Sequence, residues 1–264
     1  MIDQRSSTVG LVLSGGGTRG LAHIGAWRIL ESMGFVPATV VGSSMGAIIG
    51  ACIAAGKTAD AIERFAMSQT MRGLLQWPIT RLGITNLTKF ERGLMDFIGV
   101  EKFEHLRFPL RINATDLVHG SAVVFDLGPI WPAIRASIAF PGILAPVRTQ
   151  GCVLIDGGAL YEHPFTLLPK TVRKFVLINC SPVEHLPAER HSVVDLLRAS
   201  LNLMQNEITT LRLSAIEPSR YVMIEPRLEG RNLLETNKKF RAIIELGTEA
   251  AIEKQIAVRR LIQS

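Results

Sequence analysis

The chain has 264 residues, of which 47% are hydrophobic and only 6% aromatic, and its formal net charge is +6. This length suits one large domain with a mainly aliphatic core. The basic residues form no lysine- or arginine-rich block, which argues against nucleic acid as a partner but permits attraction to an anionic lipid surface. Three cysteines without metal-ligand spacing, Cys52, Cys152 and Cys180, predict buried thiols in a reducing compartment. We expect a cytoplasmic protein without a leader peptide.

Short apolar runs alternate with helical patterns through the first two-thirds of the chain. Buried strands are predicted at 9–13, 38–41, 110–115, 122–126, 153–155 and 175–178. Helices are predicted at 18–33, 45–55, 58–71, 89–98, 132–137, 193–216 and 236–262. This order predicts an α/β fold with a mostly parallel central sheet, in a single domain over 1–264. The uncharged stretch 40–56 is better explained by a strand, a turn and a buried helix than by a membrane span.

The last helix carries apolar and small residues at helical spacing, which we expect to pack in the core. They are Phe240, Ile243, Ile244, Gly247 and Ala251.

A glycine-rich turn, SGGGTRG, occupies 14–20 between the first strand and the first helix. Consecutive glycines let backbone N–H groups converge, and the following helix adds its positive dipole end, so the turn can hold a phosphate or an oxyanion. Gly15, Gly17 and Gly20 also fit the dinucleotide fingerprint G-x-G-x-x-G, which makes a nucleotide-dependent oxidoreductase the alternative. That fingerprint expects an acidic residue at the end of the second strand, where this chain has glycine and two serines.

A second turn, Gly42-Ser43-Ser44-Met45-Gly46, fits the pattern G-x-S-x-G between the second strand and the next helix. This setting suits a nucleophile elbow, because the strained turn tolerates only small residues close to the serine. Ser44 has glycines two positions away on both sides, so it is preferred over Ser43 as the nucleophile. The helix N-terminus behind it favours negative charge, and the N–H of Met45 can donate to an oxyanion.

A serine nucleophile needs a general base, and the sequence offers two candidates. Asp156 directly follows an apolar strand, where a carboxylate needs partners that the next two glycines can supply through their N–H groups. The same residues also fit an ordinary Asp-Gly turn. The order Ser44, Asp156, His163 matches the triad of an α/β-hydrolase, in which the histidine is the base. Asp156 is the better candidate for the base, although spacing alone does not distinguish a catalytic Asp156 from an ordinary Asp-Gly turn.

Taken together, the motifs resemble the bacterial patatin-like phospholipase family in both type and order. Five segments carry the resemblance: GGGTRG at 15–20, GSSMG at 42–46, ATD at 114–116, RASIAFP at 135–141 and DGG at 156–158. The first looks like the family's oxyanion loop, the second like its nucleophile elbow and the last like its D-G-G/A motif. The similarity covers roughly 9–180, and after Pro182 only helices are expected, at 192–262.

The resemblance implies a three-layer α/β/α patatin-like fold and hydrolysis of carboxylic esters of lipids. It implies a Ser44–Asp156 dyad working through an acyl-enzyme, without a metal or another cofactor. The implied oxyanion hole comprises Gly15, Gly16, Gly17, Thr18, Arg19, Gly20 and Met45, with the N–H groups of Gly16 and Gly17 as donors. The implied supporting glycines are Gly42, Gly46, Gly157 and Gly158. A non-catalytic regulator with the same fold is a third possibility.

Two features bear on lipid contact. Arg19, beside the implied oxyanion hole, can bind a phosphate headgroup or anchor the loop to a carboxylate, and we favour the second role. An apolar loop at 74–79 contains Trp77 and lies between Arg72 and Arg81. This pattern fits a loop packed on the core, and it also suits a lid or a lipid contact. The resemblance implies a phospholipid or another acyl-lipid as substrate, and these features agree with peripheral contact to the inner face of a membrane. The oligomeric state stays open.

Overall fold

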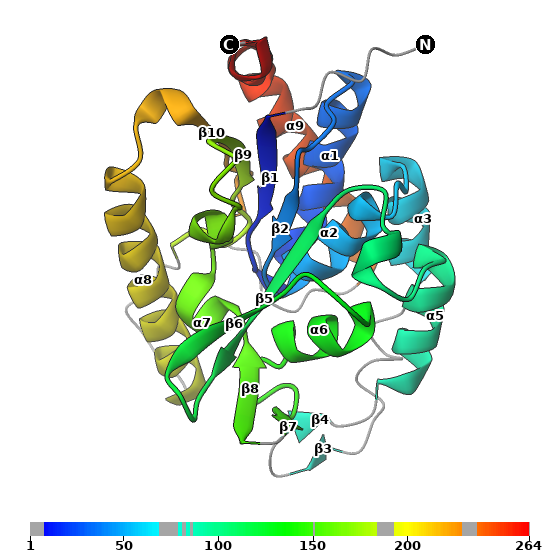
Figure 1. The fold of residues 1–264 in the computed structure, drawn as a ribbon, viewed down its shortest axis with the longest axis vertical. Helices are drawn as coiled ribbons and strands as arrows, with labels where there is room; N and C mark the ends of the chain where they lie inside the picture. Colours follow the sequence, from blue (N-terminus) through cyan, green and yellow to red (C-terminus); the bar gives the residue numbers. More distant parts are fainter. Residues whose placement is uncertain are drawn as a thin grey trace.

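The computed structural model describes residues 8–68, 79–80, 83–84, 87–149, 151–183, 193–228 and 237–263. Its centre is a sheet with the strand order β10-β9-β1-β2-β5-β8-β7, and β6 pairs with β5 (Figure 1). The strands of this sheet are β1 (Val9–Leu13), β2 (Val40–Gly42), β5 (Leu110–Asp116), β6 (Ser121–Phe125), β7 (Val147–Thr149), β8 (Cys152–Asp156), β9 (Lys174–Ile178) and β10 (Tyr221–Ile224). A separate two-stranded pair consists of β3 (Ile79–Thr80) and β4 (Gly83–Ile84).

Helices cover both faces of the sheet. They are α1 (Ala22–Ser32), α2 (Met45–Ala54), α3 (Ala59–Ser68), α5 (Thr88–Ile98), α6 (Ile130–Ser137), α7 (Gly158–Tyr161), α8 (Val193–Ser214) and α9 (Asn237–Gln263). Short 3₁₀ turns are η1 (Gly17–Leu21), η2 (Phe103–His105), η3 (Pro164–Leu167) and η4 (Pro218–Arg220). Side chains alternate along β1, so that Leu13 packs in one core with α1, α2 and α9, whereas Val12 packs in another with η3 and the end of α8. The predicted three-layer α/β/α arrangement is confirmed.

The sheet is parallel from β10 to β5 and antiparallel beyond it. The pairs β10–β9, β9–β1, β1–β2 and β2–β5 are parallel, as predicted. The pairs β5–β6, β5–β8 and β7–β8 are antiparallel. The chain therefore delivers β8 to the sheet in the opposite direction from β2.

Strand β5 brings the ends of β2 and β8 together. Gly42 ends β2 opposite Ile112, Asp156 ends β8 opposite Ala114, and β6 pairs with both of these β5 residues. Because β6 occupies one edge of β5 over this stretch, β2 and β8 share the other edge. Strand β2 runs parallel to β5 and β8 runs antiparallel to it, so the last residues of β2 and β8 face each other along that edge.

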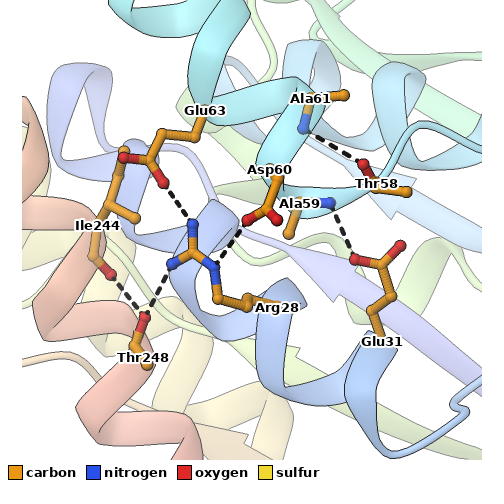
Figure 2. A network of polar contacts seen from close by, with 9 residues as sticks. All are labelled: Arg28, Glu31, Thr58, Ala59, Asp60, Ala61, Glu63, Ile244 and Thr248. Atoms are coloured by element: carbon orange, nitrogen blue, oxygen red, sulfur yellow. Dashed lines mark hydrogen bonds and ion pairs between the residues drawn. The ribbon is translucent and has the colours of Figure 1, made fainter.

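A network of polar contacts joins α1 to α3 and α9 (Figure 2). Arg28 of α1 forms an ion pair with Glu63 of α3 and another with Asp60, for which the Nε–Oδ1 distance is 3.3 Å. The same guanidinium donates to the hydroxyl of Thr248 on α9 at 3.4 Å. Glu31 accepts the N–H of the first residue of α3 at 2.9 Å, which caps that helix. The contacts fix the helix that follows the glycine turn.

Three sequence-based expectations need correction. The helix predicted from Thr18 begins as the 3₁₀ turn η1, because the two glycines before that residue have positive φ and cannot continue an α-helix. Strand β10 lies in the region where only helices were expected. Cys152 is half-buried rather than buried, since it begins β8 in the hairpin at the sheet edge, whereas Cys52 and Cys180 are buried as predicted.

The apolar stretch 40–56 forms β2, the serine turn and α2, as predicted. Among the helices of the described residues, none is both long and apolar enough to cross a bilayer. Trp77 and its neighbours at 74–78, for which lipid contact was predicted, lie outside the described residues.

Candidate active site

Ser44 occupies a strained turn between β2 and α2. Among the described residues other than glycine, it alone has a positive φ, of 53°. A Cβ atom on Gly42 would lie 2.2 Å from the carbonyl oxygen of Gly46, and one on Gly46 would lie 2.4 Å from that of Leu13. The backbone therefore approaches itself so closely that both positions require glycine. Strain of this kind persists where the surroundings fix the conformation, and it points the serine side chain away from the strand and helix.

The hydroxyl of Ser44 lies against the carboxylate of Asp156, which ends β8. Ser44 Oγ donates to Asp156 Oδ2 at 2.7 Å. The second oxygen, Oδ1, accepts the N–H of Gly158 at 2.7 Å. The structure thus brings together the two residues that the resemblance implied as nucleophile and base, although 111 residues separate them in the sequence. Their meeting follows from the shared edge of β5.

The environment of Asp156 favours proton exchange near neutral pH. The side chain is buried, and burial, followed by the negative charge of Glu162, raises its pKa to about 7. The hydrogen bonds from Ser44 and Gly158 act in the opposite direction and lower the pKa. A carboxylate whose pKa lies close to the working pH is a much stronger base than an ordinary aspartate.

Glu162 is a second buried carboxylate beside the dyad, and the sequence analysis did not identify it. A Cβ atom on Gly15 would lie 2.6 Å from both of its carboxylate oxygens, and one on Gly158 would lie 2.1 Å from Oε2. The two glycines therefore make room for this carboxylate between the glycine turn and the DGG motif. Burial raises the pKa of Glu162, while a hydrogen bond with Ser181 and the charge of Arg19 lower it.

Ser137, the last residue of α6, connects Ser44 to the segment that holds Asp156. Its Oγ accepts the N–H of Ser44 at 2.9 Å, and its carbonyl oxygen accepts the N–H of Gly157 at 3.2 Å. The carbonyl of Ala139 accepts the N–H of Asp156 at 3.0 Å. The resemblance had marked this segment without assigning Ser137 a role. Ser137 is fully buried, which only the folded structure reveals.

Two glycines of the glycine turn have backbone conformations that other residues rarely adopt. Gly16 and Gly17 have φ of 125° and 56°, which glycine adopts without strain. The N–H of Gly15 donates to the carbonyl of Glu162 at 3.1 Å, and that of Arg19 donates to the carbonyl of Gly16 at 3.2 Å. These two N–H groups therefore hold the turn, and the N–H groups of Gly16 and Gly17 stay the predicted oxyanion donors.

The remaining residues of the turn pack against neighbouring elements or bond within the turn. Thr18 is buried, and a Cβ atom on Gly20 would lie 2.5 Å from Met45 Cγ, so Gly20 lets η1 pack on the start of α2. Arg19 is buried as well, its Nε donates to Gly16 O at 3.4 Å, and its charge lowers the pKa of Glu162. A buried guanidinium near a buried carboxylate favours the anchoring role for Arg19.

The imidazole of His163 forms its hydrogen bonds with residues other than Ser44. Its Nδ1 bonds with the hydroxyl of Thr209 at 2.9 Å and its Nε2 with Asn179 Oδ1 at 2.7 Å. Burial lowers its pKa to about 4. Both ring nitrogens are engaged, and the geometry gives no support to a histidine base for Ser44. The neighbouring Ser43 is fully buried, which removes it as a competing nucleophile.

One group of potential metal ligands lies apart from the dyad in the described part of the chain. Side-chain donor atoms of Asp116, His119 and Cys152 lie within 4.8 Å of one another. Asp116 Oδ1 accepts the N–H of Val118 at 2.9 Å and that of Val153 at 3.2 Å, while Oδ2 bonds with the imidazole of His119. These hydrogen bonds satisfy the buried carboxylate and hold the β5–β6 turn against β8.

Comparisons with known proteins agree with these motifs. A family model described as patatin-like phospholipase matches residues 11–169. An uncharacterized NTE family protein of Mycobacterium tuberculosis is 41% identical over 162 residues, which is 60% of this chain and 45% of that protein. Lysophospholipase NTE1 of Candida albicans is 31% identical over 190 residues, or 68% of this chain and 13% of that protein. The chain therefore spans less than half the length of these relatives.

The fold has a counterpart among solved structures. VipD from Legionella pneumophila aligns with 94% of this chain and 66% of its own, with a TM-score of 0.57 and 16% sequence identity. The family match contains the glycine turn, the serine turn and the DGG motif, so it assigns the glycine turn to this family instead of a dinucleotide-binding one. Because the match covers more than half of the sequence, the chain belongs to the patatin-like phospholipase family.

Proposed function

We propose that the chain hydrolyses carboxylic esters of lipids, with Ser44 as nucleophile and Asp156 as general base. The hydrogen bond of 2.7 Å between Ser44 Oγ and Asp156 Oδ2 carries this proposal. Family membership supports a lipid ester as substrate, and the lysophospholipases among the relatives favour a phospholipid or lysophospholipid.

In the first half of the reaction, Ser44 Oγ attacks the carbonyl carbon of the ester and its proton passes to Asp156 Oδ2. The tetrahedral intermediate places negative charge on the former carbonyl oxygen. N–H groups of Gly16 and Gly17, with that of Met45 at the start of α2, are suited to stabilise this charge. Collapse of the intermediate breaks the bond to the alcohol, which leaves with the proton from Asp156.

In the second half, water attacks the acyl-enzyme and Asp156 accepts one of its protons. The new tetrahedral intermediate collapses, the fatty acid leaves, and the proton returns to Ser44 Oγ. Asp156 suits both halves because a pKa of about 7 lets it take up and release a proton at similar pH. No histidine is required.

Labelling with a fluorophosphonate probe tests the proposal directly, because such probes modify activated serines. We expect the wild-type protein to be labelled and Ser44→Ala to remain unlabelled. Asp156→Asn should be labelled at least about 100-fold more slowly, since the hydroxyl then lacks its base. Labelling of Asp156→Asn at the wild-type rate would contradict the dyad. A folded wild-type protein that reacts with neither the probe nor esters would favour a non-catalytic regulator.

The pH dependence of activity provides a separate prediction for Glu162. Asp156 is active as a base only when deprotonated, so kcat/KM should rise with pH through about 7. Glu162→Gln keeps the shape but removes the charge that raises the pKa of Asp156, so the rise should move to lower pH. At pH 6 the variant should keep a roughly two- to five-fold larger fraction of its plateau rate.

The matched control for this experiment is Glu245→Gln, which removes an exposed carboxylate from α9. It should leave the pH profile in place. A profile of Glu162→Gln that coincides with the wild type would show that Glu162 does not act on the base.

A further inference from the structure

Helix α8 carries large aliphatic side chains on the face that points away from the protein. These side chains are 40–62% exposed and belong to Leu196, Leu197, Leu201, Leu203, Met204 and Leu211. Residues three, four and seven positions apart lie on one side of a helix, so the six form one stripe, which we call the α8 leucine face. A surface helix normally buries its apolar stripe and exposes its polar one. Helix α8 departs from this pattern, because most of its large apolar side chains point outward.

The opposite face of α8 binds the core through polar side chains, to which Ala199 and Leu213 add apolar contacts. Its side chains donate to three backbone carbonyls: Asn202 to Pro182 at 3.1 Å, Gln205 to Gly158 at 2.7 Å and Arg212 to Leu160 at 2.8 Å. Rotating α8 to bury the leucine face would break all three hydrogen bonds and expose the carbonyls. The outward direction of the leucine face is therefore fixed by specific contacts.

The α8 leucine face lies close to the dyad. Gly158 connects them, because its N–H holds Asp156 Oδ1 and its carbonyl accepts the hydrogen bond from Gln205. A helix with its side chains is about 10 Å across. A surface that contacted the leucine face would thus lie on the order of 10 Å from the segment that holds the base.

We propose that the α8 leucine face docks on the surface of a phospholipid bilayer and brings bilayer lipid to the Ser44–Asp156 site. The inference rests on the proposed function, because diacyl phospholipid substrates are packed in bilayers. Leucine and methionine side chains enter the boundary between headgroups and acyl chains. The net charge of +6 adds attraction to anionic lipids. A docking site for a protein would more often present aromatic anchors, which the six residues lack.

A pair of double variants with matched geometry tests the docking. Leu197→Glu with Leu201→Glu places two carboxylates one turn apart on the leucine face, where the side chains are 62% and 40% exposed. The control, Ile252→Glu with Ile256→Glu, does the same on α9, where the side chains are 47% and 64% exposed. Both pairs add the same charge at exposed aliphatic positions four residues apart, so they differ in place alone.

The measurement is co-sedimentation with vesicles of phosphatidylcholine and phosphatidylglycerol. We expect the α8 variant to bind at least about 10-fold more weakly than the wild type, and the α9 control to bind within about threefold of it. Hydrolysis of a soluble short-chain nitrophenyl ester should be equal in all three proteins, as should the midpoints of thermal unfolding. Hydrolysis of vesicle phospholipid should fall in the α8 variant only.

Three results would overturn the docking: a wild type that does not bind vesicles, an α8 variant that binds like the wild type, or equal weakening in both variants. A fourth contradicting result could come from light scattering, if the wild type were a dimer and the α8 variant a monomer. The α8 leucine face would then join two copies of the chain. The proposed function has its own readout. A wild type that binds vesicles but hydrolyses no ester would leave the docking intact and contradict the enzymatic proposal.

Discussion

Asp156→Asn is expected to lower kcat/KM for ester hydrolysis by about 10³–10⁴-fold. Asparagine has the shape of aspartate, and its oxygen can still accept the N–H of Gly158, which now binds Oδ1 at 2.7 Å. The amide cannot take the proton of Ser44, so the nucleophile loses its base. Initial rates with a soluble ester, measured above pH 8 where Asp156 is charged, give the comparison. A rate within tenfold of the wild type would exclude Asp156 as the base.

The same substitution should stabilise the folded protein above neutral pH. Burial, followed by the charge of Glu162, raises the pKa of Asp156 from 3.8 to about 7, so between these values the folded state binds more protons than the unfolded state. Stability therefore falls as the pH rises through this window, and above about pH 7 the fold carries the full cost of a buried charge. Asparagine removes that cost, which is on the order of 1–4 kcal/mol.

Urea unfolding at pH 5 and pH 8 measures this effect. The stability of Asp156→Asn relative to the wild type should grow between the two pH values and stay constant above pH 8. A constant difference across the whole range would show that Asp156 has an ordinary pKa in the fold. The combination of lost activity with gained stability is the signature expected of a buried catalytic base.

Gly247→Ala is expected to destabilise the fold by about 2–4 kcal/mol. A Cβ atom at this position would lie 1.9 Å from the carbonyl oxygen of Ala22, and one at Gly25 would lie 1.8 Å from that of Ile244. Helices α1 and α9 thus touch backbone to backbone, and the clash can be relieved only by separating them. The loss should exceed the gain of about 1 kcal/mol that alanine brings to a helix interior.

Gly50→Ala in α2 is the matched control. Its Cβ atom would meet only side-chain carbon atoms, at 3.2 Å or more, so the change should be close to neutral. Urea midpoints of the two variants and the wild type give the comparison. Equal midpoints for Gly247→Ala and Gly50→Ala would contradict the tight crossing of α1 and α9.

The serine turn and the parallel half of the sheet could be predicted because their determinants are local. Gly42 and Gly46 are two residues from Ser44, and apolar runs such as Val9–Leu13 reveal buried strands without any knowledge of their neighbours. The stripe from Phe240 to Ala251 in the last helix was also predicted from spacing, and its five residues are buried in the contact with the core. In each case the residues that fix the structure lie within a few positions of one another.

The parts that the sequence did not reveal depend on distant contacts. Ser137 contacts Ser44 from 93 positions further along the sequence. Glu162 is buried where Gly15 and Gly158 leave room for it. A glutamate next to a histidine in a sequence ordinarily indicates an exposed segment. Strand β10 has four residues, too few for an alternating pattern to stand out, and it is placed by pairing with β9.

Because β2 and β8 share one edge of β5, the contact between Ser44 and Asp156 depends on the register of the sheet. Gly42, two positions before Ser44, lies opposite Ile112, and Asp156 lies opposite Ala114. A slip of β8 by two residues would keep every side chain on its own face and restore the ladder, yet it would carry Asp156 about 6.6 Å along the strand. Chains trapped in that state during refolding would show native secondary structure without esterase activity. Recovery of activity would then report that β8 has reached its native register. Circular dichroism would not detect this step, because the secondary structure is the same in both registers.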